Sequence, residues 1–236
     1  MDAFVLNGTS YSRQQLLDGC PQAQVSDYER RVLDFCQHWL SGQETFTLQT
    51  SGSTGQPKTI LLTRAQMVTS AHWTAQALGL APGDRALVCL SVTYIAGMMM
   101  LVRGFELELH LTVIDPVSRP LAPFAPAEPF DFTAMVPLQI HATLHGNVHE
   151  RTILDGMKAV LIGGAPVSLA LEEQLQRVPA PLYHTYGMTE TVSHVALRRL
   201  NGPQRSDRFV PFAEVRLGVD ARGCLTITSA LTRRET

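Results

Sequence analysis

Short apolar runs that alternate with helical patterns are the feature that most constrains how this chain folds. Strand-like runs cover residues 86–90, 109–114, 132–136, 158–162 and 181–185. Helical patterns lie between or after them, at 98–105, 138–144 and 168–178. Strands that alternate with helices favour a parallel sheet covered on both faces. The sequence therefore predicts an α/β fold with a mainly parallel sheet flanked by helices.

The two ends of the chain have different patterns. Capping-box spacings at Ser26 and Thr63 predict helices over 27–40 and from 64 to about 78, with a short strand at 44–49 before the second helix. After Thr191 only strand-like segments follow, at 193–199, 209–217 and 224–228, and Gly218 and Gly223 are expected to frame a turn. We expect a compact α/β core over 1–192 and, within the same large domain, a small antiparallel β-rich subdomain over 193–236.

Composition limits the partners and the compartment. The 236 residues carry 19 Lys+Arg against 21 Asp+Glu, so the chain lacks the basic field of non-specific nucleic-acid binding. No run reaches the roughly 18 apolar residues of a membrane span, and the N-terminus lacks a cationic signal region. The four cysteines are far apart, as in proteins of a reducing compartment. We expect a cytoplasmic protein, and the sequence leaves open whether it forms a homodimer.

The stretch from Thr50 to Lys58 carries the strongest chemical signal. It reads T-S-G-S-T-G-Q-P-K and combines four hydroxyl side chains and two glycines with one of only two lysines in the chain. Glycines allow backbone N–H groups to converge, and hydroxyls and a lysine add donors and charge. The loop therefore suits a polyphosphate, although a Ser/Gly linker is the plain alternative. A Walker P-loop is excluded because the G-x-x-G-x-x-K spacing differs.

Two further loops follow predicted strands. One is Y-H-T-Y-G-M-T-E-T at 183–191, and the other is G-G-A-P at 163–166. Loops at the carboxyl edge of a parallel sheet are where α/β folds bind ligands. Glu190 is an oxygen ligand suited to Mg²⁺, and Thr189 can donate to a phosphate oxygen. A solvated surface turn and an ordinary strand-to-helix turn are the alternatives for the two loops.

Together, the three loops resemble the signature loops of the adenylate-forming superfamily of acyl-CoA synthetases, adenylation domains and luciferases. This resemblance implies an AMP-forming acid–CoA ligase that uses ATP, Mg²⁺ and CoA with a small-molecule carboxylate. It places Thr50, Ser51, Gly52, Ser53, Thr54, Gly55 and Lys58 around the ATP phosphates, and Gly163, Gly164 and Ala165 along the adenine and acyl pocket. It also assigns the run Thr185, Tyr186, Gly187, Met188, Thr189 and Glu190 to the nucleotide site, where Tyr186 would stack near the adenine. Lys58, Thr189 and Glu190 are the implied catalytic residues, with Glu190 holding the metal.

A narrower resemblance concerns the acid. The segment L-S-V-T-Y-I-A-G-M-M-M-L-V-R at 90–103 and the run E-T-V-S at 190–193 are similar to segments of o-succinylbenzoate–CoA ligases of menaquinone synthesis. Tyr94 stands where a histidine is usual in those enzymes. The resemblance implies a substrate pocket lined by Tyr94, Gly97, Arg103 and Ser193, with Arg103 as the cation for a second carboxylate. A solvated helix position is the alternative for Arg103.

The family's small C-terminal domain supplies a further lysine and admits CoA, and the resemblance implies that it is absent from residues 1–236. Two other readings of function remain open: a ligase for another aromatic or fatty carboxylate, and a non-catalytic nucleotide or acyl-adenylate binding module. Two patterns carry less weight. His141, His145 and His149 have helical spacing, but Gly146-Asn147 interrupts it, which argues against zinc. Met98, Met99 and Met100 are best explained as core residues.

Overall fold

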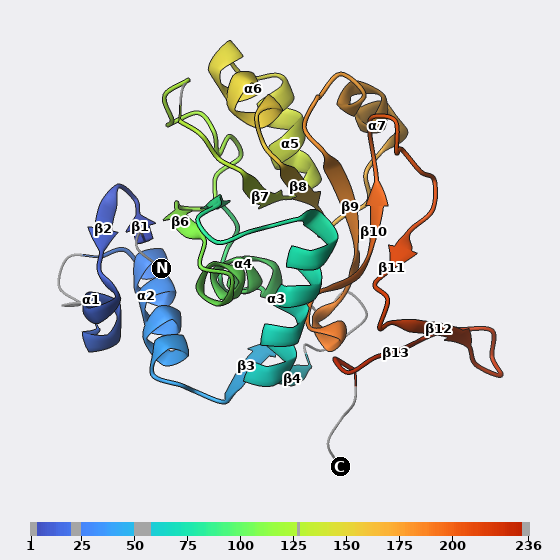
Figure 1. Ribbon diagram of the computed structural model, residues 1–236, viewed down its shortest axis with the longest axis horizontal. Coiled ribbons are helices and arrows are strands. Elements are labelled where there is room, and N and C mark those ends of the chain that lie inside the picture. The colour runs from blue at the N-terminus through green and yellow to red at the C-terminus, as the bar shows by residue number, and fades with distance from the viewer. Residues whose placement is uncertain (1–3, 20–24, 50–57, 127, 233–236) are drawn as a thin grey trace.

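The computed structural model describes residues 4–19, 25–49, 58–126 and 128–232, and it contains a nine-stranded sheet (Figure 1). In sheet order the strands are β11 (Val210–Pro211), β10 (His194–Arg199), β9 (Leu182–Gly187), β8 (Ala159–Ile162), β7 (Phe132–Met135), β5 (Arg85–Val88), β6 (His110–Val113), β1 (Phe4–Leu6) and β2 (Thr9–Tyr11). The six central strands, from β9 to β1, are mutually parallel. The predicted, mainly parallel α/β sheet is confirmed.

Helices cover both faces of this sheet (Figure 1). One group consists of α2 (Asp27–Leu40), α3 (Arg64–Leu78) and α4 (Ile95–Glu106), and the other of α5 (Pro137–Leu144), α6 (Val148–Asp155) and α7 (Leu169–Leu175). Each group belongs to its own apolar core. Strand β5 contributes to both, since Ala86 and Val88 lie in the first core and Leu87 in the second. This explains why the predicted strands are continuously apolar instead of alternating.

Local capping signals set where the helices begin. Ser26 and Thr63 each accept a bond from the backbone N–H three residues on, at 3.2 Å, and the reciprocal bonds of the capping box are present. Asn147 and Glu150 form another capping box, which starts α6 after α5 has ended at Leu144. The histidine spacing is therefore divided between two helices. In the described ranges, no group of three metal-binding side chains is placed to hold an ion.

The terminal regions differ from the prediction. The β1–β2 hairpin and α1 (Arg13–Asp18) had no clear sequence signal, and β1 pairs with β6 far along the chain. The expected strand at 209–217 is divided by a turn, in which the Val215 N–H donates to the Phe212 carbonyl. Its first part, β11, stays on the main sheet next to β10, and its second part, β12 (Arg216–Val219), forms a separate antiparallel hairpin with β13 (Leu225–Thr228). Gly218 lies inside that hairpin opposite Thr226, so it does not frame a turn.

A further antiparallel hairpin lies outside the main sheet. It pairs β3 (Thr45–Gln49) with β4 (Thr59–Thr63) and joins α2 to α3. The predicted phosphate loop connects its two strands, and residues 50–57 of that loop lie outside the described residues. Separately, no helix in the described part of the chain has the length and apolar character needed to cross a membrane.

Candidate functional site

Two of the three predicted loops meet at the carboxyl ends of neighbouring parallel strands. Gly163 follows β8, and its N–H donates to the Met135 carbonyl at 3.1 Å. A Cβ atom on Gly163 would lie 2.2 Å from Thr185 Oγ1 on β9. A side chain at residue 163 would therefore force the Thr185 hydroxyl to move. The Gly163–Ala165 turn therefore lies directly against the strand that carries Thr185 and Tyr186.

A cluster of three aromatic side chains, His184, Tyr186 and Phe209, lies beside this turn. His184 and Tyr186 project from the same side of β9, and their rings pack on Phe209 with centroid separations of 5.2 and 5.7 Å. Burial and the nearby Arg198 lower the pKa of His184, although its bond to the Ala165 backbone acts in the opposite direction. The Tyr186 side chain remains exposed. Its ring is thus held by Phe209 and available to a flat ligand.

A tight reversal follows β9. A Cβ on Gly187 would lie 2.2 Å from the Ser193 carbonyl oxygen and 2.5 Å from His194 Cα. Thr191 Oγ1 accepts from the Met188 N–H at 2.9 Å. Val192 has a φ of 68° although it is β-branched and buried, which is a strained backbone conformation. The reversal is therefore fixed by backbone packing, and it leaves Met188 and Glu190 exposed and Thr189 half-buried.

Glu190 lies on the 3₁₀ helix η2 (Thr189–Thr191), and its side chain is exposed. It takes part in none of the ion pairs found among the described residues. Mg²⁺ in nucleotide sites is commonly held by one or two carboxylates together with phosphates and water. A single exposed carboxylate of this kind fits a magnesium ion that arrives with ATP, and it does not fit a site built from protein ligands alone.

The two lysines have different surroundings. Lys58 is exposed and directly precedes β4, where it continues from the loop that lies outside the described residues. In Figure 1 the β3–β4 hairpin and the 3₁₀ turn after β9 lie at the same end of the molecule. Lys158 pairs with Asp84 and, at 3.3 Å, with Asp131, and its bond to Asp84 is the main cause of its raised pKa. Lys158 therefore holds the opposite edge of the sheet together, and the place of Lys58 in the candidate site stays a prediction.

Arg103, one of the predicted substrate residues, lies in an unusual environment. It is 1% exposed, so the solvated-helix alternative is wrong. Its Nη2 donates to Ser193 Oγ at 3.1 Å, its Nε has no hydrogen-bond partner, and no carboxylate in the described part of the chain pairs with it. Burial lowers the pKa of Arg103 to about 9. A buried cation without a counterion is costly, and proteins keep such groups chiefly at functional sites.

The other predicted acyl-pocket residues lie elsewhere on α4. Tyr94 is the residue before the first turn of this helix and is 58% exposed. Gly97 packs against the preceding loop, where a Cβ would lie 2.3 Å from the Ser91 carbonyl oxygen. Tyr94 and Arg103 are nine residues apart, which is about 13 Å along a helix. The structure thus brings Arg103 to Ser193, whereas Tyr94 and Gly97 lie at the other end of α4.

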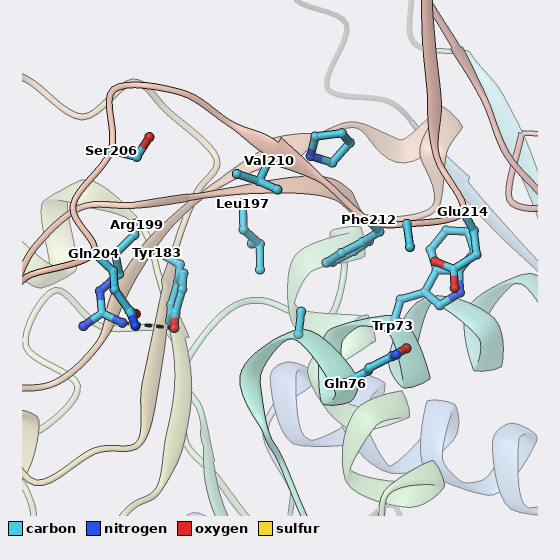
Figure 2. A pocket seen from close by; sticks show the side chains of 13 residues that line it. Trp73, Gln76, Tyr183, Leu197, Arg199, Gln204, Ser206, Val210, Phe212 and Glu214 are labelled. Carbon is cyan, nitrogen blue, oxygen red and sulfur yellow. Dashed lines mark hydrogen bonds between the residues drawn. The ribbon is translucent and has the colours of Figure 1, made fainter.

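Two cavities lie outside this arrangement. One of about 380 Å³ opens between α3 and strands β9 to β11, where Trp73 and Phe212 face Tyr183 and Arg199 (Figure 2). In it the Arg199 guanidinium donates to the Tyr183 hydroxyl at 3.0 Å. The other, of about 700 Å³, lies beside β1, β5 and β6. None of the predicted site residues that the structure describes lines either cavity, so the pocket shared by Tyr94, Gly97, Arg103 and Ser193 stays a prediction.

Comparison with known proteins now decides the family. The family of AMP-binding enzymes matches residues 8–225. The chain belongs to this family. A 2-succinylbenzoate–CoA ligase of Bacillus cereus (strain ZK / E33L) is 27% identical over 213 residues, which cover 81% of this chain and 44% of that protein. The one from Bacillus mycoides (strain KBAB4) is 28% identical over 162 residues, or 68% and 34% of the two chains. This AMP-binding enzyme chain therefore spans less than half the length of these curated relatives.

Solved structures agree with this assignment. An acyl-CoA synthetase (AMP-forming)/AMP-acid ligase II-like protein from Dyadobacter fermentans DSM 18053 is 50% identical, with a TM-score of 0.82 over 90% of this chain and 60% of that one. An o-succinylbenzoate coenzyme A synthetase from Bacillus subtilis, solved with ATP and magnesium, has a TM-score of 0.62 at 19% identity, covering 80% and 42%. The second likeness shows the fold alone.

Sequence reasoning missed His194, which follows Ser193 and is 6% exposed. Its Nε2 lies 3.1 Å from Thr74 Oγ1, and its Nδ1 lies 3.3 Å from Ser193 Oγ. Burial and the charge of Arg103 hold the pKa of His194 well below its usual 6.5. A histidine directly after a predicted substrate residue was the available signal, although its position on the buried side of β10 could not be inferred.

The lowered pKa of His194 predicts a pH-dependent stability. Between the depressed folded pKa and the unfolded value of 6.5, the unfolded chain binds a proton that the folded chain does not. The free energy of unfolding should therefore fall as the pH drops below 6.5, by up to about 1.4 kcal/mol per pH unit. Urea unfolding at pH 7.5, 6.5 and 5.5 measures this, with His194→Leu as the control. An equal slope in the variant would contradict the assignment to His194.

Proposed function

We propose that this chain is the large domain of an AMP-forming acid–CoA ligase, and that its acid is o-succinylbenzoate. The ligase would first join the acid to AMP with release of pyrophosphate, and would then transfer the acyl group to CoA. Membership of the AMP-binding enzyme family supports the ATP-dependent step. The curated relatives that carry the name 2-succinylbenzoate–CoA ligase support the acid, at 27–28% identity.

One observation carries the choice of acid class. Arg103 is buried beside Ser193 and has no carboxylate partner among the described residues. A monocarboxylic acid loses its charge when it becomes an acyl-adenylate and would leave this cation unpaired. A dicarboxylic acid keeps one carboxylate after activation, and this carboxylate can accept a charge-assisted bond from the guanidinium. Arg103 therefore favours an acid with two carboxyl groups.

The ATP step assigns roles to the three loops. The acid carboxylate attacks the α-phosphate, so two anions must approach each other. In the proposed site Thr50–Gly55 and Lys58 bind the β- and γ-phosphates, and Thr189 contacts the α-phosphate. The Gly163–Ala165 turn and the ring of Tyr186 bind the adenine. Glu190 would hold Mg²⁺, which neutralises charge on the departing pyrophosphate.

Two alternatives give different binding patterns. A ligase for a simple aromatic or fatty acid would bind the adenylate of a monocarboxylic acid as well as that of a dicarboxylic one. A non-catalytic module would bind the nucleotide or adenylate, and no acyl-AMP would form even when the chain is supplemented with the remaining part of a relative.

The test is calorimetry on the chain itself with two non-hydrolysable adenylate analogues. One carries o-succinylbenzoate, and the other carries 3-benzoylpropionate, which lacks the ring carboxylate. We expect the first analogue to bind at least about tenfold more tightly, since a bond to a charged group contributes roughly 1.5–3 kcal/mol. Equal affinities would favour the monocarboxylate ligase, and binding of neither analogue would contradict the proposal.

Glu190→Gln tests the metal assignment. The amide keeps the size of the side chain and removes its charge, so ATP affinity in Mg²⁺ should fall by roughly 10- to 100-fold. Affinity for ATP in EDTA should not fall, because without the metal the carboxylate only repels the phosphates. Glu173→Gln, an exposed glutamate on α7, is the matched control. An undiminished magnesium effect in Glu190→Gln would remove Glu190 from the metal site.

A further inference from the structure

A line of buried polar side chains connects Arg103 on α4 with helix α3. Arg103 Nη2 lies 3.1 Å from Ser193 Oγ, which lies 3.3 Å from His194 Nδ1. On the other side of the ring, His194 Nε2 lies 3.1 Å from Thr74 Oγ1. Thr74 Oγ1 in turn lies 3.0 Å from the Ser70 carbonyl oxygen. The four side chains Arg103, Ser193, His194 and Thr74 are all buried. We refer to them as the arginine relay.

The two ends of the relay together set the direction of its bonds. An arginine side chain only donates, so Ser193 Oγ accepts from Arg103. Thr74 donates its one hydroxyl hydrogen to the Ser70 carbonyl oxygen, so Thr74 Oγ1 accepts from His194 Nε2. The ring proton therefore lies on Nε2. Nδ1 is then unprotonated and accepts from the Ser193 hydroxyl.

The surroundings of His194 keep the ring neutral. The charged group that faces the ring is Arg103 from α4. Helix α3 contributes the Thr74 hydroxyl, and the imidazole packs on the Phe212 ring with a centroid separation of 5.5 Å. Among the described residues no carboxylate faces His194 to stabilise an imidazolium. A protonated ring would also add a second cation beside Arg103 in a dry region. Only the neutral ring with its proton on Nε2 satisfies all of these contacts.

The backbone around the relay is also fixed. Strand pairing between β9 and β10 shifts register between His194 and Ala196, which is the mark of a β-bulge. This irregularity follows directly on the strained Val192. Bulges re-aim side chains, and strained residues persist only where the surrounding structure holds them. The placement of Ser193 and His194 therefore requires a strained backbone next to them.

We propose that His194 is a positioning residue that fixes Arg103 through Ser193, and that it thereby sets the preference for an acid with a second carboxylate. The inference rests on the proposed function and adds a determinant outside the predicted site. With the Ser193 hydroxyl directed to His194, the guanidinium is anchored by one N–H, and its other donors remain for the substrate carboxylate. Without the acceptor at Nδ1, the Ser193 hydroxyl and the guanidinium lose their fixed orientation.

The test compares His194→Asn with His194→Leu. Their side chains are isosteric, so both leave the same space and remove the same ring. Asparagine keeps an acceptor close to the position of Nδ1, whereas leucine has none. The measurement is the ratio of affinities for the o-succinylbenzoyl and 3-benzoylpropionyl adenylate analogues, taken by calorimetry on the full chain. Loss of stability alone would weaken both analogues together and leave this ratio unchanged.

We expect His194→Leu to lower the ratio about tenfold and His194→Asn to keep it within about threefold of the wild type. An unchanged ratio in His194→Leu, or an equal loss in both variants, would overturn the relay. Failure of the proposed function looks different, because the wild-type chain would then bind neither analogue or show no preference between them. In that case the inference falls together with the function on which it rests.

Discussion

Replacing Gly187 by alanine is expected to lower the free energy of unfolding by about 3 kcal/mol, at the upper end of overpacking effects. The new Cβ would stand 2.2 Å from the Ser193 carbonyl oxygen and 2.5 Å from His194 Cα. Both are backbone atoms, so no side-chain rotation can relieve the contact. The start of β10 would have to move and carry Ser193 with it. Binding of the o-succinylbenzoyl adenylate analogue should become undetectable by calorimetry.

Gly156→Ala is the matched control for this change. Gly156 follows α6 with a φ of −85°, and a Cβ there would lie 3.7 Å from its nearest neighbours, an ordinary contact. Alanine at this position should leave stability unchanged or raise it by up to about 1 kcal/mol, because it restricts the unfolded chain. Urea unfolding and calorimetry on both variants make the comparison. If Gly187→Ala behaved like Gly156→Ala, the tight reversal after β9 would not be required for the site.

The fold was predictable wherever local signals decide it. The capping boxes at Ser26 and Thr63 depend on side chains three residues apart, and the buried strands are short apolar runs, so both are written in adjacent residues. The pairing of β1 with β6 joins segments about a hundred residues apart, and three-residue strands leave little pattern. The division between β11 and β12 likewise depends on which sheet each part joins. Such tertiary choices override local propensity.

In the candidate site, too, the features set by local sequence were predictable and those set by tertiary contacts were not. Neighbouring parallel strands end at one edge of the sheet, which is why Gly163 and Thr185 could be expected to lie together. Helical spacing alone could not tell a solvated Arg103 from a buried one, because its environment is set by β10 and by a bulge. The role of His194 depends on hydrogen bonds to residues 1 and 120 positions away, of which only the first is visible in the sequence.

Arg103→Met is expected to have opposite effects on stability and on binding. Methionine fills much of the same buried volume without charge, so it removes a cation that has no counterion among the described residues. Replacing buried charges by apolar side chains of similar size is often stabilising by about 1–4 kcal/mol. Urea unfolding should therefore show a more stable chain, and the midpoint should shift without a change in slope.

Binding should change in the other direction. Removing one member of a buried, hydrogen-bonded charge pair costs roughly 2–5 kcal/mol, so affinity for the o-succinylbenzoyl adenylate analogue should fall about 30-fold or more. The 3-benzoylpropionyl analogue has no ring carboxylate and should bind Arg103→Met as well as it binds the wild type. A gain in stability joined to a selective loss of one ligand is the pattern of a residue kept for function at a cost in stability. If both analogues lost affinity equally, or neither did, Arg103 would not be the cation that binds the second carboxylate.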